Sequence, residues 1–283
     1  VRVRYLVGFV GRYALEAPGP IVLLSSQNER AGGAANVAAT LALLGIKTHL
    51  IGCVGDDLEA QSLSKLIANA GIDTKGLVTS KQRPTIAKTR IVSGHQQMMR
   101  LDQESNSAFT IDETKSVLNA IQIALTTKPT VVILSDYAKG LRSLEVCQTV
   151  IAQCNALQIP VLVDPKGSDY SKYQGATALT PNKKETAEAC KTDVNDVDLI
   201  AKASALKNNL GLQFFAVTRG EEGITLIDDA THHLPATAKQ VFDVSGAGDT
   251  VIATLAAGLM NGLEPLAALQ LANLAAGVVV GKV

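Results

Sequence analysis

The sequence FDVSGAGDTV, residues 242–251, places two glycines and two aspartates directly before an apolar run with helical spacing. This spacing predicts that Gly246, Ala247 and Gly248 lie at the N-terminus of a helix. Unpaired backbone N–H groups and the positive end of the helix dipole converge there, and glycines let an anion approach closely. We therefore predict an anion-binding nest, with the Asp249 carboxylate beside it and able to take a proton from an attacking hydroxyl.

A purely structural interpretation of this stretch stays open. A tight turn before a helix would use the same glycines, and Asp249 would then only cap the helix or interact with its dipole. The phosphate-binding pattern G-x-x-x-x-G-K-[ST] does not occur in the sequence, so phosphate binding cannot be assigned to a P-loop.

The composition argues against several classes of partner. Lys plus Arg and Asp plus Glu both number 26, so the chain has no overall field that would attract nucleic acid or an anionic membrane. Hydrophobic residues make up 47% of the chain, yet no apolar run approaches the roughly 18 residues needed to span a bilayer. The first residues do not resemble a signal peptide and the cysteines show no metal or disulfide spacing, so we expect a cytoplasmic protein.

Short apolar strands alternate with helical segments from Ala31 onward, which predicts an α/β fold. Helices are expected at 57–70, 111–126 and 144–157. This order predicts a doubly wound, mostly parallel sheet with helices on both faces, in one domain that covers residues 1–283. The strands lie in THLIGCVG, TVVILSDYAKG, PVLVDPKG, ATALTPN and FFAVTRG. Ligands of such sheets bind beyond the carboxyl ends of the strands, so the polar residues there are candidates.

One segment departs from this alternation. Residues 85–102 read as two strands joined around Ser93 and Gly94, with no helix between them. Together with 19–26 they are expected to form a small β-sheet, contributed by about residues 12–30 and 84–103, that covers a site as a lid or pairs with another subunit. The alternative is an ordinary antiparallel edge of the main sheet.

A second glycine cluster, AGGAANVAATLALLG, predicts another helix that starts at Gly32 and Gly33 and ends at Gly45. Close approach of the backbone and the Asn36 amide one turn into the helix would suit a polyhydroxylated ligand. Packing of the helix through its small residues explains the alanines equally well, so both interpretations stay open.

Charged residues follow two neighbouring strands and are candidate ligand contacts. Asp136 and Lys139 come after the first strand, and Asp164 and Lys166 come after the second. Because the carboxyl ends of parallel strands meet at one edge of a sheet, we expect these side chains to lie near one another.

Two further strand ends add polar groups. Asn182 and Glu185 are three residues apart, so at a helix start they share a face and are predicted to hold a hydrated Mg²⁺. The alternative for this pair is an N-cap box. Thr218, Arg219 and Gly220 end another strand, and a hairpin turn is the structural alternative there.

These motifs resemble those of the ribokinase-like carbohydrate kinases. The two hallmark segments are GGAAN at 32–36 and DVSGAGD at 243–249. Within that family the chain is most similar to the D-glycero-beta-D-manno-heptose 7-phosphate kinases, through EAPGPIV, GGAANVA, QQMMRLD, LSDYAKG, VLVDPKGSDYSKYQGATALTPN, VTRGEEG, DVSGAGDTVI and ANLAAGVVVGK. The resemblance implies a ribokinase-like fold and transfer of the ATP γ-phosphoryl group to the anomeric hydroxyl of heptose 7-phosphate, in ADP-heptose and lipopolysaccharide core synthesis.

The resemblance also implies roles for individual residues. Asp249 is the base, and Gly246, Ala247 and Gly248 form the anion hole. The nucleotide and its Mg²⁺ are expected at Asn182, Lys183, Lys184, Glu185, Thr218, Arg219, Gly220, Gly223, Asn273 and Gly277, with Asn182 and Glu185 holding the metal through water. The sugar phosphate is expected at Gly32, Gly33, Asn36, Gln97, Arg100, Asp136 and Lys166. A homodimer through the β lid is the expected assembly.

The chain departs from the family pattern in two places. Relatives begin with a strand that ends in a G-D-x-x-x-D-like segment, whose aspartate contacts sugar hydroxyls, whereas VRVRYLVGFVGRYALEAP contains no aspartate. Either residues precede this chain or the sugar site is altered, which leaves other acceptors open, such as a fructose phosphate or a nucleoside. Relatives also continue beyond the equivalent of Val283, so a nucleotidyltransferase domain is expected to follow in the whole protein.

Two rivals come from other classes. A catalytically silent sensor of sugar or nucleotide on the same fold would lack the base, whereas Asp249 is present. An NAD-dependent Rossmann enzyme would carry G-x-G-x-x-G after its first strand. Gly246 and Gly248 instead lie late in the chain, and the third glycine is missing.

Overall fold

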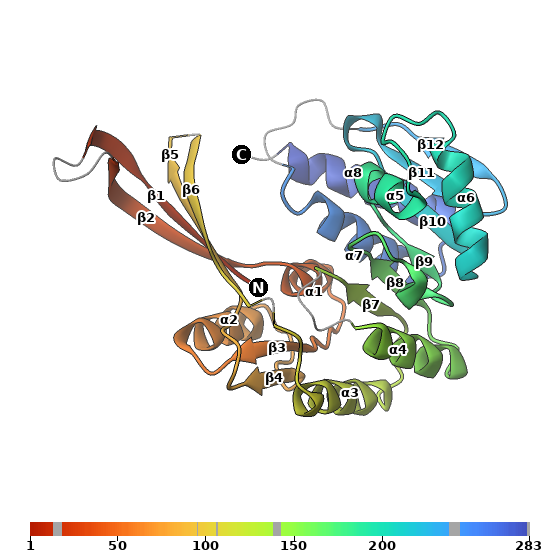
Figure 1. The fold of residues 1–283 in the computed structure, drawn as a ribbon, viewed down its shortest axis with the longest axis horizontal. Helices are drawn as coiled ribbons and strands as arrows, with labels where there is room; N and C mark the ends of the chain where they lie inside the picture. Colours follow the sequence, from red (N-terminus) through yellow and green to blue (C-terminus); the bar gives the residue numbers. More distant parts are fainter. Residues whose placement is uncertain (14–18, 95, 106, 138–142, 238–243, 282–283) are drawn as a thin grey trace.

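The computed structural model describes residues 1–13, 19–94, 96–105, 107–137, 143–237 and 244–281 (Figure 1). These residues form a helix-covered body from which a long, twisted β-sheet projects to one side. Among them, no helix is long and apolar enough to cross a membrane.

The main sheet of the body has the strand order β12-β11-β10-β9-β8-β7. Its parallel strands are β7 (Val132–Ser135), β8 (Val161–Asp164), β9 (Ala178–Leu179) and β10 (Phe214–Thr218). The antiparallel strands β11 (Ile224–Ile227) and β12 (Thr231–Leu234) extend one edge. The central strands are buried on both faces, which is why their sequences read as continuous apolar runs.

Helices cover both faces of this sheet, as expected for the α/β class (Figure 1). One face packs against α1 (Ala34–Leu43), α7 (Ala247–Met260) and α8 (Pro265–Val280). The other face packs against α3 (Ile111–Leu125), α4 (Leu144–Ala156) and α6 (Leu199–Leu210). The predicted fold class is therefore confirmed.

Local capping explains where the predicted helices begin. Asp57 and Ser143 each accept a hydrogen bond from a backbone N–H three residues on, at the starts of α2 (Leu58–Asn69) and α4. Thr110 and Glu113 form a capping box at the start of α3. The helices predicted at 57–70, 111–126 and 144–157 are confirmed to within one residue at either end.

The sheet is less continuous than the sequence predicts. β3 (Gly52–Gly55) and β4 (Leu77–Ser80) form a separate parallel pair, and no described strand joins β3 to the edge strand β7. A largely apolar cavity of about 550 Å³ lies between β7 and residues 46–51, beside α1 and α3. The hydrophobic pattern predicts where strands form, but it does not determine which edges become hydrogen-bonded.

The predicted lid is a four-stranded sheet in the order β2-β1-β5-β6, set apart from the main sheet (Figure 1). Its strands are β1 (Arg2–Tyr13), β2 (Pro20–Ala31), β5 (Ala87–Ser93) and β6 (Gln96–Gln103). The hairpin after Ser93 is confirmed, and the alternative of an edge of the main sheet is wrong. The predicted boundary near residue 12 is also wrong, because β1 begins at Arg2 and pairs along its length with both β2 and β5.

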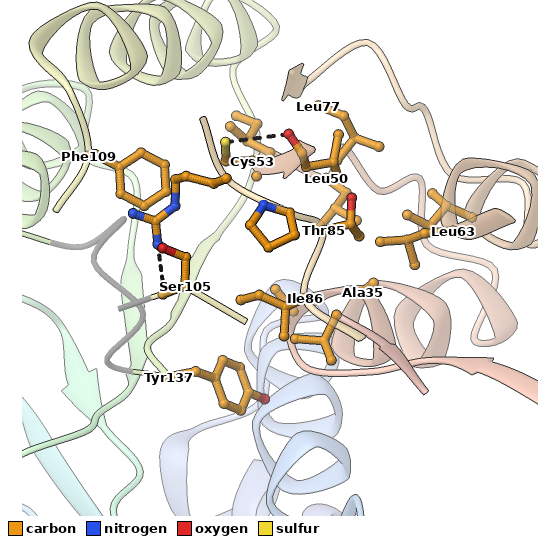
Figure 2. Close-up of a pocket in the computed structure, with 18 of the residues that line it drawn as sticks. Ala35, Leu50, Cys53, Leu63, Leu77, Thr85, Ile86, Ser105, Phe109 and Tyr137 are labelled. Carbon is orange, nitrogen blue, oxygen red and sulfur yellow. Dashed lines mark hydrogen bonds between the residues drawn. The ribbon is translucent and has the colours of Figure 1, made fainter. Parts of the chain in front are cut away.

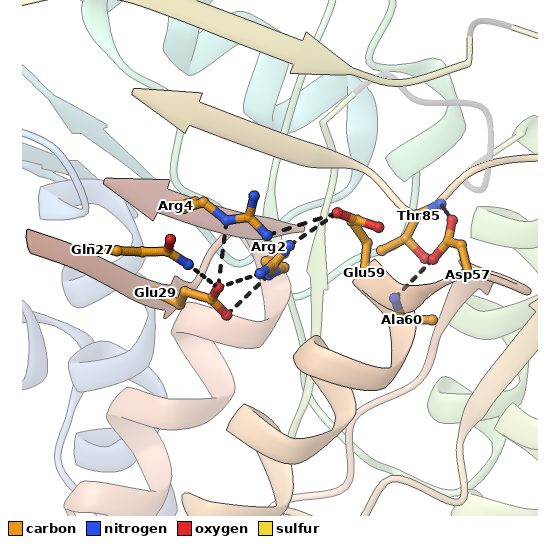
Figure 3. A network of polar contacts seen from close by, with 8 residues as sticks. All are labelled: Arg2, Arg4, Gln27, Glu29, Asp57, Glu59, Ala60 and Thr85. Carbon is orange, nitrogen blue, oxygen red and sulfur yellow. Dashed lines mark hydrogen bonds and ion pairs between the residues drawn. The ribbon is translucent and has the colours of Figure 1, made fainter. Parts of the chain in front are cut away.

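A buried arginine joins the base of the lid to the body (Figure 3). Arg2 of β1 forms an ion pair with Glu29 of β2, and its Nη1 lies 3.1 Å from Oε1 of Glu59 on α2. The Arg2 side chain is only 4% exposed, so its charge depends on these two carboxylates. The lid is thus fastened to α2 by charge pairing as well as by backbone continuity.

Candidate active site

The glycine segment lies at the start of α7, as predicted. Gly246 is the N-cap residue and has a φ of 81°, a left-handed conformation that glycine adopts without strain. The first N–H groups of a helix have no partner within it. In α7 the Ala247 N–H instead donates to the carbonyl oxygen of Val244 at 3.2 Å, in the turn before the helix. A Cβ atom placed on Gly248 would meet nothing within 4 Å, so the space beside the turn is open for a ligand.

Two side chains from distant parts of the sequence bind the Asp249 carboxylate. The Asn36 amide on α1 donates from Nδ2 to Oδ2 of Asp249 at 2.7 Å. The Tyr137 hydroxyl, just beyond the end of β7, donates to Oδ1 at 2.8 Å. The two glycine clusters predicted from the sequence therefore meet at one carboxylate, although Tyr137 was not among the predicted site residues.

The surroundings of Asp249 affect its proton affinity in opposite ways. Burial raises the pKa of Asp249, while the hydrogen bonds from Asn36 and Tyr137 lower it and offset part of that rise. A carboxylate can accept about four hydrogen bonds, so both oxygens keep capacity for a substrate hydroxyl. The group is therefore suited to accept a proton beside the helix N-terminus.

The Asp136 carboxylate makes contacts that the sequence did not predict. Its carboxylate accepts hydrogen bonds at 2.7 Å from both Lys172 and Tyr173, and it is 3% exposed. Lys172 and Tyr173 belong to the short 3-10 helix Ser171–Tyr173. The described contacts of Asp136 are thus structural, and a contact with the sugar stays a prediction.

Asn182 and Glu185 form the capping box that was the alternative to a metal site. They lie at the start of α5 (Lys183–Cys190), where each side chain accepts the backbone N–H of the other. The Lys166 ammonium also lies 2.5 Å from Oε1 of Glu185, and this hydrogen bond raises the pKa of Lys166. The oxygen donors suit Mg²⁺ by type, but they already have partners, so the metal role stays a prediction.

Eight of the ten predicted nucleotide residues lie in the segments at the ends of β9 and β10. Asn182 and Thr218 form a parallel β-bridge, which brings these two segments together. Lys183 lies 2.7 Å from Glu222, and Arg219 pairs with the same carboxylate. Lys184 is exposed and pairs only loosely with Glu188, at 3.9 Å. Lys183 and Arg219 are therefore held together by Glu222, a partner that the sequence did not indicate.

Gly220 and Gly223 shape the turn between β10 and β11. Gly223 has a φ of 95°, and a Cβ atom there would lie 2.0 Å from the carbonyl oxygen of Leu234. This close approach of β12 requires glycine on steric grounds, and a phosphate contact stays a prediction.

Asn273 and Gly277 lie on α8, where the adenine wall is expected. Asn273 is buried and donates from Nδ2 to the carbonyl oxygen of Pro235 at 2.7 Å, so it fastens the segment after β12 to the helix.

Two parts of the predicted site lie outside the described residues. They are Lys139 and residues 238–243, which include Asp243 of the hallmark segment.

Gln97 and Arg100 lie on β6, the edge strand of the lid. Gln97 pairs with Val92 beside the hairpin turn, near the tip that projects away from the body (Figure 1). Arg100 pairs with Asp102 on the same strand, at 2.9 Å. The described hydrogen bonds of Asp249 come from Asn36 and Tyr137, and not from Gln97 or Arg100.

A cavity of about 120 Å³ lies between the ring of Tyr137 and the β3-β4 pair (Figure 2). Arg83 borders it, with its guanidinium 4.2 Å from the centre of the Phe109 ring. Ligand pockets are usually about 300–1,000 Å³, so this cavity is too small for a sugar phosphate. Tyr137 therefore shares a cavity with Ile86, the residue before the lid strand β5.

The match to known proteins covers almost the whole chain. Residues 4–283 match the model of the pfkB family carbohydrate kinases. The chain is 60% identical over 282 residues to the bifunctional protein HldE of Methylobacillus flagellatus, and 48% identical over 284 residues to that of Magnetococcus marinus. Each match covers 99% of this chain but only 58% of the relative, so the chain spans little more than half the length of these relatives.

Solved structures share the fold at low sequence identity. Ribokinase of Arabidopsis thaliana, complexed with ribose and ATP, has a TM-score of 0.73 at 22% identity, covering 99% of this chain and 90% of that one. Phosphofructokinase-2 of Escherichia coli, in complex with potassium, has a TM-score of 0.81 at 16% identity over the same shares. These neighbours confirm the ribokinase-like fold, and the family match over nearly the full chain shows that it belongs to the pfkB family of carbohydrate kinases.

Proposed function

We propose that this chain is an ATP-dependent kinase that phosphorylates the anomeric hydroxyl of D-glycero-beta-D-manno-heptose 7-phosphate to give the 1,7-bisphosphate. The observation that carries the proposal is the Asp249 carboxylate, held by Asn36 and Tyr137 beside the glycine start of α7. The choice of heptose rests on the family resemblance of the sequence segments and is supported by the identity to HldE proteins. The product would serve ADP-heptose and lipopolysaccharide core synthesis in the cytoplasm.

In this mechanism Asp249 takes the proton of the anomeric hydroxyl while the hydroxyl oxygen attacks the γ-phosphorus of ATP. The bond between the γ-phosphorus and the bridging oxygen breaks, and ADP leaves with that oxygen. The backbone N–H groups of Gly246, Ala247 and Gly248 stabilise the charge on the transferred phosphoryl group. Lys166 follows β8, and its ammonium pairs with Glu185. We propose that this ammonium also binds a phosphate of the substrate. Mg²⁺, when bound, would neutralise charge on the ATP phosphates, and Asn182 and Glu185 are the residues proposed to hold it through water.

An assay of ATP consumption over a panel of acceptors tests the substrate. We expect the highest kcat/KM with heptose 7-phosphate, compared with free heptose, fructose phosphates, other hexoses and nucleosides. Phosphorus NMR of the product should place the new phosphate on C1. A clear preference for a nucleoside or an unphosphorylated hexose would contradict the heptose assignment and leave the kinase assignment intact.

We also propose that two copies of the chain pair through their lids. Leu6, Ile91 and Met99 form a row across β1, β5 and β6, and Leu101 follows on the same face. Met99 and Leu101 are 52% and 53% exposed in a single chain. Apolar surface of this kind on a β-sheet marks an interaction site, and a second copy would bury it against its own equivalent.

Charge on this face should separate the two copies. We expect Met99→Glu combined with Leu101→Glu to convert a dimer to a monomer, measured by light scattering coupled to size-exclusion chromatography. Val197→Glu is the matched control, because Val197 is 97% exposed outside the lid. A wild-type chain that is monomeric at micromolar concentration, or a double variant that stays dimeric, would refute the lid interface.

A further inference from the structure

The Asp249 carboxylate is bound by donors from two different elements, and one of them has no assigned role. Asn36 was predicted as a sugar contact, whereas Tyr137 lies next to Asp136 in the LSDYAKG segment and carried no prediction. Its hydroxyl reaches Oδ1 of Asp249 at 2.8 Å, across 112 positions of sequence. The Asn36 amide occupies Oδ2, so the two donors hold the carboxylate from both sides.

The glycines around this carboxylate make room for the two donors. A Cβ atom on Gly33, which has a φ of 60°, would lie 3.1 Å from Cε2 and 3.3 Å from Cζ of the Tyr137 ring. A Cβ atom on Gly246 would lie 3.3 Å from Nδ2 of Asn36. Both glycine segments therefore permit the donors to approach Asp249, in addition to any contact that they make with ligands.

We propose that Tyr137 is a positioning residue, whose hydroxyl holds the Asp249 carboxylate in the orientation for proton abstraction and stabilises its ionised form. The proposal rests on the proposed function, in which Asp249 is the base. A neutral donor suits this task, because its hydrogen bond stabilises the ionised carboxylate. A cationic donor would instead form an ion pair with the base.

The described residues around Asp249 supply little charge. α1, α8 and the rest of α7 contain no ionisable side chain. At the strand ends, the Asp136 carboxylate faces Lys172 and Tyr173, and Asp164 ends β8. Burial raises the pKa of Asp249, and the hydrogen bonds from Asn36 and Tyr137 act against it. Removing either donor should therefore favour the protonated, inactive form of the base.

Tyr137→Phe tests this role, because it removes the hydroxyl and leaves the ring beside Gly33. We expect the acid limb of the profile of kcat against pH to move to higher pH by about one pH unit. This shift corresponds to the loss of one hydrogen bond to a charged group. At a pH below that limb, kcat of the variant should be up to about tenfold lower than that of the wild type. Raising the pH should restore most of the lost kcat. KM for ATP should stay the same, because the proposed role of the hydroxyl is to hold the base.

Tyr170→Phe is the matched control, since it also removes a buried hydroxyl, one that lies 3.4 Å from the carbonyl oxygen of Glu185. Its acid limb should coincide with that of the wild type, and thermal unfolding of both variants establishes that they fold. A Tyr137→Phe enzyme whose kcat falls equally at every pH, or does not fall, would overturn the positioning role. If Asp249→Asn retained wild-type turnover, the proposed base itself would fail, so the two failures are distinguishable.

Discussion

Asp249→Asn should lower kcat by about 10²- to 10⁴-fold, which is the contribution typical of a positioned general base. Asparagine has the same shape and still offers one oxygen to the Asn36 amide, so the fold and the nest at Gly246 should be preserved. ATP binding should therefore remain close to that of the wild type. Steady-state phosphoryl transfer gives the loss in kcat, and calorimetric titration with ATP gives the binding constant.

Asp57→Asn is the matched control for this experiment. Asp57 also lies at a helix start, where it caps α2 and accepts backbone hydrogen bonds from Ala60 and Thr85. Its substitution should reduce stability slightly and leave kcat near the wild-type value. If Asp249→Asn behaved in the same way as Asp57→Asn, Asp249 would only stabilise its helix, and the structural interpretation of the glycine segment would be correct.

Features of the fold that depend on local sequence were predictable. The helices α2, α3 and α4 begin at Asp57, Thr110 and Ser143, whose side chains cap them, so their limits follow from neighbouring residues alone. The division between β7 and the β3-β4 pair, and the early start of the lid at Arg2, depend on which edges meet in three dimensions. Sequence periodicity carries no information on that choice.

The candidate site was predictable in its parts but not in its pairings. The helix start at Gly246 and the base at Asp249 follow from a local motif, and the capping box of Asn182 and Glu185 was the stated alternative to a metal site. Asp136 and Tyr137 are adjacent beyond the end of β7, yet Asp136 accepts from Lys172 and Tyr173 whereas Tyr137 donates to Asp249. Only the packed structure shows that Tyr137 is the one that faces Asp249.

Asp136→Ala should destabilise the protein by about 3 kcal/mol, because it leaves the Lys172 ammonium and the buried Tyr173 hydroxyl without their common acceptor. For a chain of this size the thermal midpoint should fall by roughly 5–10 °C. Thermal unfolding followed by circular dichroism measures the effect. Glu188→Gln is the matched control, because the Lys184–Glu188 pair is exposed and such pairs contribute little, so its midpoint should hardly change.

The same variant decides between the two roles of Asp136. If its carboxylate only stabilises the fold, KM for the sugar phosphate should be nearly that of the wild type when Asp136→Ala is assayed at low temperature, where the variant is folded. If it contacts sugar hydroxyls, KM should rise while the thermal midpoint stays in place. A combined Asp136→Ala and Lys172→Met variant sharpens the comparison: removing both charges should recover part of the lost stability, because the ammonium no longer lacks its partner. No recovery of stability would show that the ion pair is not what Asp136 contributes.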